Sequence, residues 1–360
     1  SILVSSIILI ILFLCGILTV LIVFLSKDEL VLKDESPLVS ILIAARDEEN
    51  NILDCLKSIQ QLTYQNFEVW IGNDKSTDGT QILIEKFIAD KPNFNLLDIE
   101  TDLGSAKGKS NVLAQLTHKA KGDYFFITDA DISVPQNWIQ NMLAAIKEDT
   151  GIVSGFTLTN GKGLFAKMQR VDWAYAMGMV KVVSDFGKPI VGIGNNMAVT
   201  RNAYFSTGGY EKLPFSVVED YQLFTEITKN GYGFANLLNK EIYAESKPLS
   251  TLTELLKQRK RWMFGAFQLP ISVLGILTLQ ATYYSLALVL CVVKPQVGIN
   301  IIVFKTFVQA VFIKAVFNKI GEKVSFFHLI LFEFYQLTLS TASLINYFLP
   351  SKIEWKGRKY

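Results

Sequence analysis

The stretch YFFITDAD, residues 124–131, places a short apolar run directly before two aspartates that are one residue apart. A short apolar run with polar boundaries is typical of a buried strand. Two carboxylates so close together at a buried strand end repel each other unless a cation lies between them. Because Mg²⁺ and Mn²⁺ prefer oxygen ligands, the stretch predicts a strand that carries a divalent-cation site, Asp129 and Asp131, at its carboxyl end.

The same pattern recurs on both sides of this stretch. Strand-like runs occupy 38–45, 67–72, 94–99, 124–128 and 152–156, and helix-like stretches occupy 48–61, 80–89, 107–120, 136–147 and 162–184. Strands that alternate with helices predict an α/β fold with a mostly parallel sheet covered on both faces. Ligands bind such sheets beyond the carboxyl ends of the strands, which is where the polar clusters of this chain fall.

Five more polar clusters are candidates for chemistry. They are AARDEE at 44–49, NDKSTDG at 73–79, GSAKGKS at 104–110, the acids Glu219 and Asp220, and QRKRW at 258–262. Each one alone also fits an ordinary role: a turn, a helix N-cap, a solvated basic loop, an acidic helix start or a membrane-boundary anchor. Their order along the chain therefore carries more information than any single cluster.

Both ends of the chain are apolar. Residues 2–25 carry no charge and could span a hydrocarbon layer of about 30 Å. Charged residues follow at 27–29, where a signal peptide would have a small-residue cleavage site, so we expect an anchor rather than a cleaved signal. The whole chain then divides into an N-terminal transmembrane anchor at 1–26, a globular domain at 37–250, an interfacial segment at 251–269 and about three transmembrane helices within 270–350.

Composition excludes several classes of protein. Hydrophobic residues make up 50% of the 360 residues and charged residues 19%, with a net charge of +2. This near balance gives no electrostatic footprint for nucleic acid. Three cysteines without paired spacing indicate neither a disulfide framework nor a zinc site, and two histidines cannot build a histidine-rich metal centre.

Taken in order, the segments ARDE, NDKSTDG, AKGKSN, TDAD, ED and QRKRW, followed by apolar helices, resemble glycosyltransferase family 2 over residues 38–262. The likeness is greatest to its membrane-embedded branch with DxD, ED and QxxRW segments. The resemblance implies a GT-A fold, a divalent cation (Mg²⁺ or Mn²⁺) and transfer of a sugar from a nucleotide-sugar, with inversion at the anomeric carbon. The family usually has two acids where this chain has Asn73 and Asp74.

The resemblance also assigns roles to individual residues. Asp74 would contact the base, with Ala45 and Glu48 lining the nucleotide pocket. Lys107 would lie on the phosphate side, Asp129 would face the sugar and ribose, and Asp131 would bind the metal. Asp220 would be the general base. The diphosphate and acceptor side would be formed by Glu219, Gln258, Arg259, Arg261 and Trp262.

Several alternatives remain open. We expect an integral membrane protein with a cytoplasmic catalytic domain that acts on a lipid or lipid-linked acceptor, and a processive polysaccharide synthase is the alternative. A nucleotidyltransferase would also place carboxylates and metal at strand ends, and a non-catalytic transport or assembly subunit would need functional ionisable residues inside the spans. With three C-terminal spans, the basic tail lies outside, against the positive-inside tendency, so the number and orientation of the spans stay undecided.

Overall fold

The computed structural model describes residues 2–23, 28, 30–32, 35–189, 192–266, 271–350, 354–355 and 358–359. The chain forms two compact units. The helical unit comprises residues 1–26, 161–182 and 248–353. The α/β unit comprises residues 27–160, 183–247 and 354–360.

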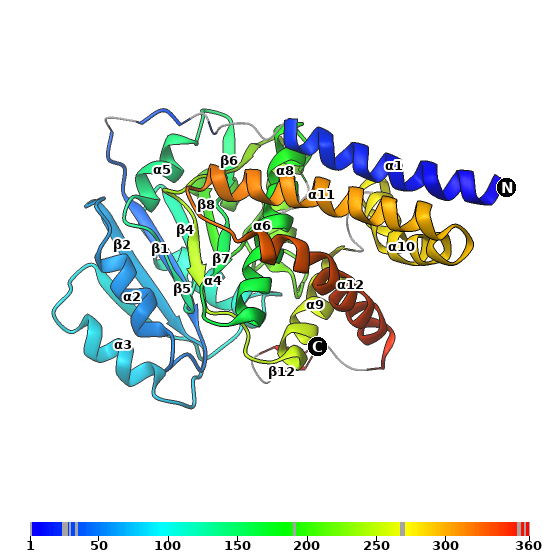
Figure 1. The fold of residues 1–360 in the computed structure, drawn as a ribbon. Helices are drawn as coiled ribbons and strands as arrows, with labels where there is room; N and C mark the ends of the chain where they lie inside the picture. Colours follow the sequence, from blue (N-terminus) through cyan, green and yellow to red (C-terminus); the bar gives the residue numbers. More distant parts are fainter. Residues whose placement is uncertain are drawn as a thin grey trace. The chain divides into compact units, whose positions relative to one another are not determined.

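A seven-stranded sheet forms the centre of the α/β unit, in the order β3-β2-β1-β4-β8-β6-β9 (Figure 1). Six strands run parallel, and β8 alone runs against its neighbours β4 and β6. The strands are β1 (Val39–Ala45), β2 (Phe67–Asn73), β3 (Phe94–Asp98), β4 (Tyr124–Asp129), β6 (Thr150–Ser154), β8 (Asn196–Thr200) and β9 (Gly233–Asn236). The predicted α/β class with a mostly parallel sheet is confirmed.

Helices cover both faces of this sheet, as the alternation of side chains along β1 requires. Ile41 and Ile43 pack into one core with α2 (Ile52–Gln60), α3 (Thr80–Ile88) and α5 (Trp138–Ala144). Leu42 packs into the other core with α4 (Lys109–Lys119), α7 (Arg201–Ser206) and α8 (Glu219–Lys229). With both faces covered, β1 reads as a nearly continuous apolar run.

The register of the strands brings their carboxyl ends to one edge. Ala45 lies opposite Asn73 of β2, and Ala44 lies opposite Asp129 of β4. A second sheet of β5 (Ile132–Ser133), β10 (Ala244–Ser246) and β7 (Thr157–Thr159) begins just after β4, and β11 (Glu354–Trp355) pairs with β12 (Arg358–Lys359). The loops after β1, β2 and β4 therefore share one edge of the main sheet.

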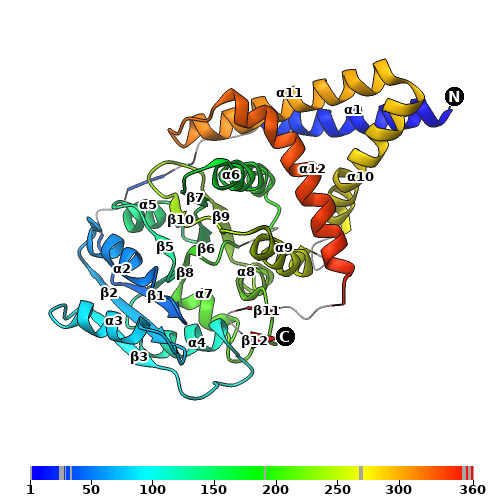
Figure 2. The ribbon, with the colours of Figure 1, turned by 60° about the horizontal axis from the view of Figure 1, so that its bottom comes forward.

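The helical unit contains α1 (Ile2–Val23), most of α6 (Leu164–Asp185), α9 (Leu252–Ala266), α10 (Ile271–Val293), α11 (Pro295–Lys319) and α12 (Phe326–Phe348). Helix α11 packs against α1, α10 and α12, and α1 and α11 run side by side in both views (Figures 1 and 2). A Cβ at Gly298 would lie 2.5 Å from the backbone nitrogen of Cys291, so the absence of a side chain allows α11 to approach α10. Among the described residues, α11 is the one helix long and apolar enough to cross a membrane.

Candidate active site

Two loops at the carboxyl edge of the sheet, 46–49 after β1 and 75–80 after β2, hold each other in place. Asp47 accepts the backbone N–H of Thr77 at 2.8 Å, and Glu49 accepts that of Gly79 at 2.9 Å. In return, the hydroxyl of Thr80 accepts the backbone N–H of Glu48 at 2.7 Å. This reciprocal bonding ties the two loops into one fixed unit.

Asp47 and Lys75, one in each loop, have positive φ angles of 52° and 54°. Residues other than glycine adopt this conformation at a cost, and such residues cluster at functional sites. Each of the two loops therefore holds one side-chain-bearing residue in a costly backbone conformation.

The residues predicted for the nucleotide pocket come together here. Ala45, Glu48 and Asp74 are buried, with exposures of 1%, 6% and 4%. The amide of Asn51 donates to Glu48 Oε2 at 2.8 Å, and the guanidinium of Arg46 donates to the backbone carbonyl of Asp74 at 2.7 Å. These contacts fix the backbone and side chains that would face a base.

Asn73, the departure from the usual pair of acids, has a structural reason. Its side-chain amide donates to Asp98 Oδ1 at 2.9 Å and to Gln81 Oε1 at 3.1 Å. An aspartate at this buried position would have no hydrogen to donate and would face Asp98 as a like charge. The side-chain amide of Asn73 can therefore bond to Asp98 at the end of β3, which a second acid could not do.

The lysine segment before α4 gives an unexpected arrangement. Gly108 takes a φ of 58° at the helix start, Lys107 is exposed, and Lys109 turns inward. The ammonium of Lys109 lies 2.6 Å from Asp129 Oδ1 and 3.1 Å from Glu219 Oε1. The sequence analysis assigned the role of the cationic site residue to Lys107 and none to Lys109. The glycine directly before Lys109 at the helix start could have indicated that this lysine also deserves a role.

Lys109, Asp129, Glu219 and Asp220 form a compact charged group, which we call the acidic cluster. Burial alone would lower the pKa of Lys109, but the three carboxylates raise it well above its ordinary value. Burial and the neighbouring charge of Glu219 raise the pKa of Asp220, while Lys109 acts in the opposite direction. One cation thus balances part of the charge of three acids.

Asp220 is fixed at the start of α8. Its Oδ2 accepts the backbone N–H of Gly194 at 3.0 Å, and its Oδ1 accepts that of Tyr221 at 2.8 Å. A Cβ at Gly194 would lie 2.5 Å from the Cβ of Asp220, so the loop after residue 191 reaches the carboxylate only because residue 194 is glycine. Acids also suit a helix start, so the ordinary role and a catalytic role are compatible here.

Asp131 follows Asp129 at the entrance to β5 and is half-buried. The thiol of Cys55 donates to the backbone carbonyl of Asp129 at 3.5 Å. Burial raises the pKa of this thiol, and Asp131 and Asp129 raise it further, which keeps it protonated. Cys55 is therefore a packing residue beneath the aspartates rather than a nucleophile.

The aspartate pair offers oxygen ligands to a cation. Within the described part of the chain, no group of three or more His, Cys, Asp or Glu side chains lies together as a metal site. Mg²⁺ commonly binds through one or two carboxylates and takes its remaining ligands from phosphates and water. Asp129 and Asp131 fit that kind of site and do not form a complete cage.

The QRKRW segment lies on α9, in the helical unit. Gln258, Arg261 and Trp262 are three and four residues apart, so they share a face of the helix, and all three are half-buried. Arg259 instead forms an ion pair with Asp172 of α6. Lys260 is buried and donates to the backbone carbonyl of Leu349 at 2.8 Å, near the end of α12.

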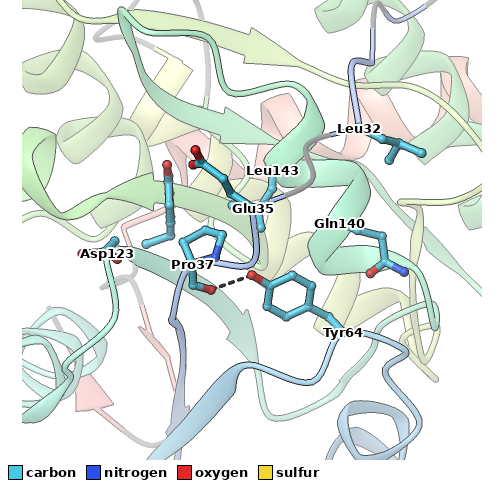
Figure 3. A pocket seen from close by; sticks show the side chains of 8 residues that line it. Leu32, Glu35, Pro37, Tyr64, Asp123, Gln140 and Leu143 are labelled. Carbon is cyan, nitrogen blue, oxygen red and sulfur yellow. Dashed lines mark hydrogen bonds between the residues drawn. The ribbon is translucent and has the colours of Figure 1, made fainter.

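A separate cavity of about 240 Å³ lies at the opposite edge of the sheet, before β1 and β4 (Figure 3). The hydroxyl of Tyr64 donates to the backbone carbonyl of Pro37 at 2.5 Å, and both residues line the cavity (Figure 3). It is lined by Leu32, Glu35, Pro37, Tyr64, Asp123, Tyr124, Gln140 and Leu143. None of the predicted site residues lines this cavity.

Curated relatives match the chain over about two thirds of its length. A poly-beta-1,6-N-acetyl-D-glucosamine synthase from Staphylococcus aureus is 28% identical over 240 residues, which are 65% of this chain and 56% of the relative. A beta-monoglucosyldiacylglycerol synthase from Synechocystis sp. is 25% identical over 242 residues, which are 64% of this chain and 48% of the relative. The chain thus spans about half the length of the curated relatives it matches.

A solved structure resembles the chain over nearly its whole length. It is the mannosyltransferase PcManGT from Pyrobaculum calidifontis in complex with GDP-Man and Mn²⁺, with a TM-score of 0.60, 14% identity and coverage of 97% of this chain and 99% of that one. At this identity the likeness shows the fold, which is of the GT-A type predicted from the resemblance.

The family model named glycosyl transferase family 21 matches residues 7–360. A glycosyltransferase is therefore confirmed, whereas the predicted assignment to family 2 is not. Because the match covers almost every residue, the chain belongs to glycosyl transferase family 21.

Proposed function

We propose that this chain is an inverting, cation-dependent hexosyltransferase. It moves a sugar from a nucleotide-sugar, with a UDP-linked donor as the first candidate, to a lipid or lipid-linked acceptor. The observation that carries the proposal is the acidic cluster: Asp129, Glu219 and Asp220 converge on Lys109 beside the strand ends that carry the buried Glu48 and Asp74. Membership of a glycosyltransferase family supplies the class of reaction.

The donor would bind at the fixed loops after β1 and β2. Asp74 would accept a hydrogen bond from the base, and Ala45 and Glu48 would line the pocket. Lys107 is exposed just before α4, and its long cationic side chain would contact diphosphate oxygens. Asp129 would face the ribose and sugar.

Asp220 would take the proton of the acceptor hydroxyl. As the hydroxyl oxygen bonds to C1 of the sugar, the C1–O bond to the diphosphate breaks and the nucleoside diphosphate leaves. Asp220 suits this role because a base with a raised pKa holds the proton more firmly. Glu219 and Lys109 tune that pKa in opposite directions.

Asp129 and Asp131 would hold a divalent cation, Mg²⁺ or Mn²⁺. When bound, such an ion neutralises charge that develops on a departing diphosphate. Gln258, Arg261 and Trp262 would contribute to the diphosphate and acceptor side, as the resemblance implies.

The helical unit would hold the protein in a membrane, with the catalytic domain in the cytoplasm where nucleotide-sugars are made. Helix α11 supports this by its length and composition. One curated relative is named as a glycolipid synthase and the other as a polysaccharide synthase. A processive synthase is therefore the second candidate.

The test is a donor panel. Protein purified in detergent is incubated with UDP- and GDP-sugars, Mn²⁺ and extracted lipids, and products are read by mass spectrometry. We expect a lipid that gains one hexose, whereas a ladder of additions would support the processive alternative. Transfer of the nucleotide portion, or no transfer and no donor hydrolysis with any donor, would contradict the proposal.

A further inference from the structure

Helix α6 anchors the chain that leads into α9. The side chain of Gln169 donates to the backbone carbonyl of Leu249 at 2.9 Å and accepts the backbone N–H of the same residue at 3.0 Å. This two-way contact joins α6 to the segment immediately before α9, within the helical unit. One turn further along α6 is Asp172.

Asp172 makes the second connection between the two helices. Its carboxylate pairs with the guanidinium of Arg259 on α9, and their side chains are 13% and 16% exposed. The residues are 87 positions apart in the sequence. Burial raises the pKa of Asp172, and the charge of Arg259 counteracts that rise. Arg259 therefore favours the charged form of the Asp172 carboxylate.

Arg259 in turn packs on Trp262. The centre of its guanidinium lies 4.5 Å from the centroid of the Trp262 ring, within the range of a cation–π contact. The ring of Trp173 also packs against Trp262, edge to face, with 5.2 Å between the ring centroids and an interplanar angle of 77°. Trp173 follows Asp172 directly, so consecutive residues of α6 act on the same indole, one directly and one through Arg259.

We infer that Asp172 is a positioning residue for Trp262 and acts through Arg259. A carboxylate fixes the plane of a guanidinium, and that plane fixes the face of the indole on which it stacks. Arg259 then positions Trp262 and does not contact the diphosphate. The diphosphate contact proposed for the QRKRW segment would be made by Arg261. The inference rests on the proposed role of Trp262 in transfer.

The structure provides a matched control on the same helix. Arg170 of α6 pairs with Glu322 at 3.2 Å, also within the helical unit. Glu322→Gln breaks the ion pair that α6 makes through Arg170, whereas Asp172→Asn breaks the pair that leads to Trp262. A difference between the two variants reports on positioning and not on the general loss of a charge pair.

The experiment measures transfer and donor binding in both variants. We expect Asp172→Asn to lower the rate of transfer about 10²-fold, as small misplacements of a site group do, with the donor Kd unchanged. Glu322→Gln should stay within about twofold of the unsubstituted protein. Transfer by Asp172→Asn at the normal rate, or an equal loss in Glu322→Gln, would overturn the inference.

A spectroscopic readout separates this inference from the proposed function. Two indoles at the Trp173–Trp262 separation couple their transitions, and Trp262→Phe identifies that couplet in circular dichroism. Asp172→Asn should reduce the couplet even if no donor or acceptor is known, while Glu322→Gln should keep it. A full couplet in Asp172→Asn would refute positioning, whereas failure of the unsubstituted protein to transfer sugar would refute only the proposed function.

The double variant Asp172→Asn/Arg259→Gln tests whether the loss is a folding defect. It removes both buried charges, so it should recover the thermal stability that Asp172→Asn loses. It still lacks the guanidinium on Trp262, so transfer should remain low. Recovery of transfer together with stability would contradict a positioning role.

Discussion

Two lysines of this protein lie against carboxylates, and they differ in what surrounds them. Lys109 in the α/β unit lies against Asp129 and Glu219, with Asp220 close by. Lys305 in the helical unit lies 2.5 Å from a single acid, Glu333, and both side chains are almost fully buried. The first group carries a surplus of negative charge, whereas the second is neutral as a pair.

The neutral pair makes further contacts through the Lys305 ammonium and one carboxylate oxygen of Glu333. Gln309 donates to Glu333 Oε2 at 3.2 Å, and the rings of Tyr283 and Tyr284 lie 4.9 and 5.2 Å from the Lys305 ammonium. A balanced, enclosed pair is typical of a structural contact, whereas uncompensated charge at a strand edge is typical of a site that binds cations or moves protons. Both lysines are largely buried against acids, so charge balance distinguishes the two groups and burial does not.

The largest expected effect on the rate of transfer comes from a substitution in the acidic cluster around Lys109. Asp220→Asn removes the proposed base and should lower transfer by about 10²–10⁴-fold. Donor binding, measured by calorimetry, should stay close to normal because the predicted base-binding residues are untouched. Near-normal turnover in this variant would assign the base to another residue.

For the Lys305–Glu333 pair, single and double substitutions should differ in their effect on stability. Lys305→Met leaves Glu333 buried without its partner and should destabilise the protein by about 3–5 kcal/mol, measured by thermal unfolding in detergent. Lys305→Met/Glu333→Met should recover most of that loss, because no unpaired charge remains. If the single variant keeps its stability but loses transfer, the pair has a functional role and the comparison fails.

The two lysines of the α4 segment provide a smaller test. Lys107→Met removes an exposed charge and should weaken donor binding by about 10- to 100-fold, the worth of a charge-assisted contact, with little change in stability. Lys109→Met should lower stability and change the pH dependence instead. The reverse assignment of effects would show that Lys109 is the phosphate ligand.

The smallest effect is a displacement along the pH axis. Transfer should fall as pH drops through the raised pKa of Asp220, because a protonated carboxyl cannot accept the hydroxyl proton. Glu219 raises that pKa and Lys109 lowers it. Glu219→Gln should therefore move the acid limb of the pH–rate profile to lower pH, and Lys109→Met should move it to higher pH. Movement of both variants in the same direction would contradict this coupling.

Much of the sheet could be predicted from the sequence because its inner strands are short, apolar and separated by helical periodicity. Predicted runs at 38–45, 67–72 and 94–99 differ from β1, β2 and β3 by no more than one residue at either end. The antiparallel strand β8 was missed, because NMAVT carries little periodic signal in five residues. Its position between β4 and β6 depends on long-range pairing, which local pattern does not reveal.

The residue types of the candidate site could be read from the sequence, whereas the contacts between those residues could not. Glu48 and Asp74 lie on loops after β1 and β2, Asp129 is the last residue of β4, and Asp220 lies in the first turn of α8. Their roles stay predictions. The choice between Lys107 and Lys109 depends on the residue at which α4 begins, and helix ends are uncertain by one or two residues. Asp172 could not be paired with Arg259 beforehand, because nothing local relates residues on two distant helices.

The mutual bonding of loops 46–49 and 75–80 has a consequence for kinetics. Asp47, Thr77, Glu49 and Gly79 meet through hydrogen bonds made by the protein alone, so the loops are shaped before a donor arrives. A donor bound at these loops, as proposed, would lose little affinity to ordering the protein. Its association would then be limited by encounter, and occupancy would follow the supply of nucleotide-sugar without a lag from loop closure.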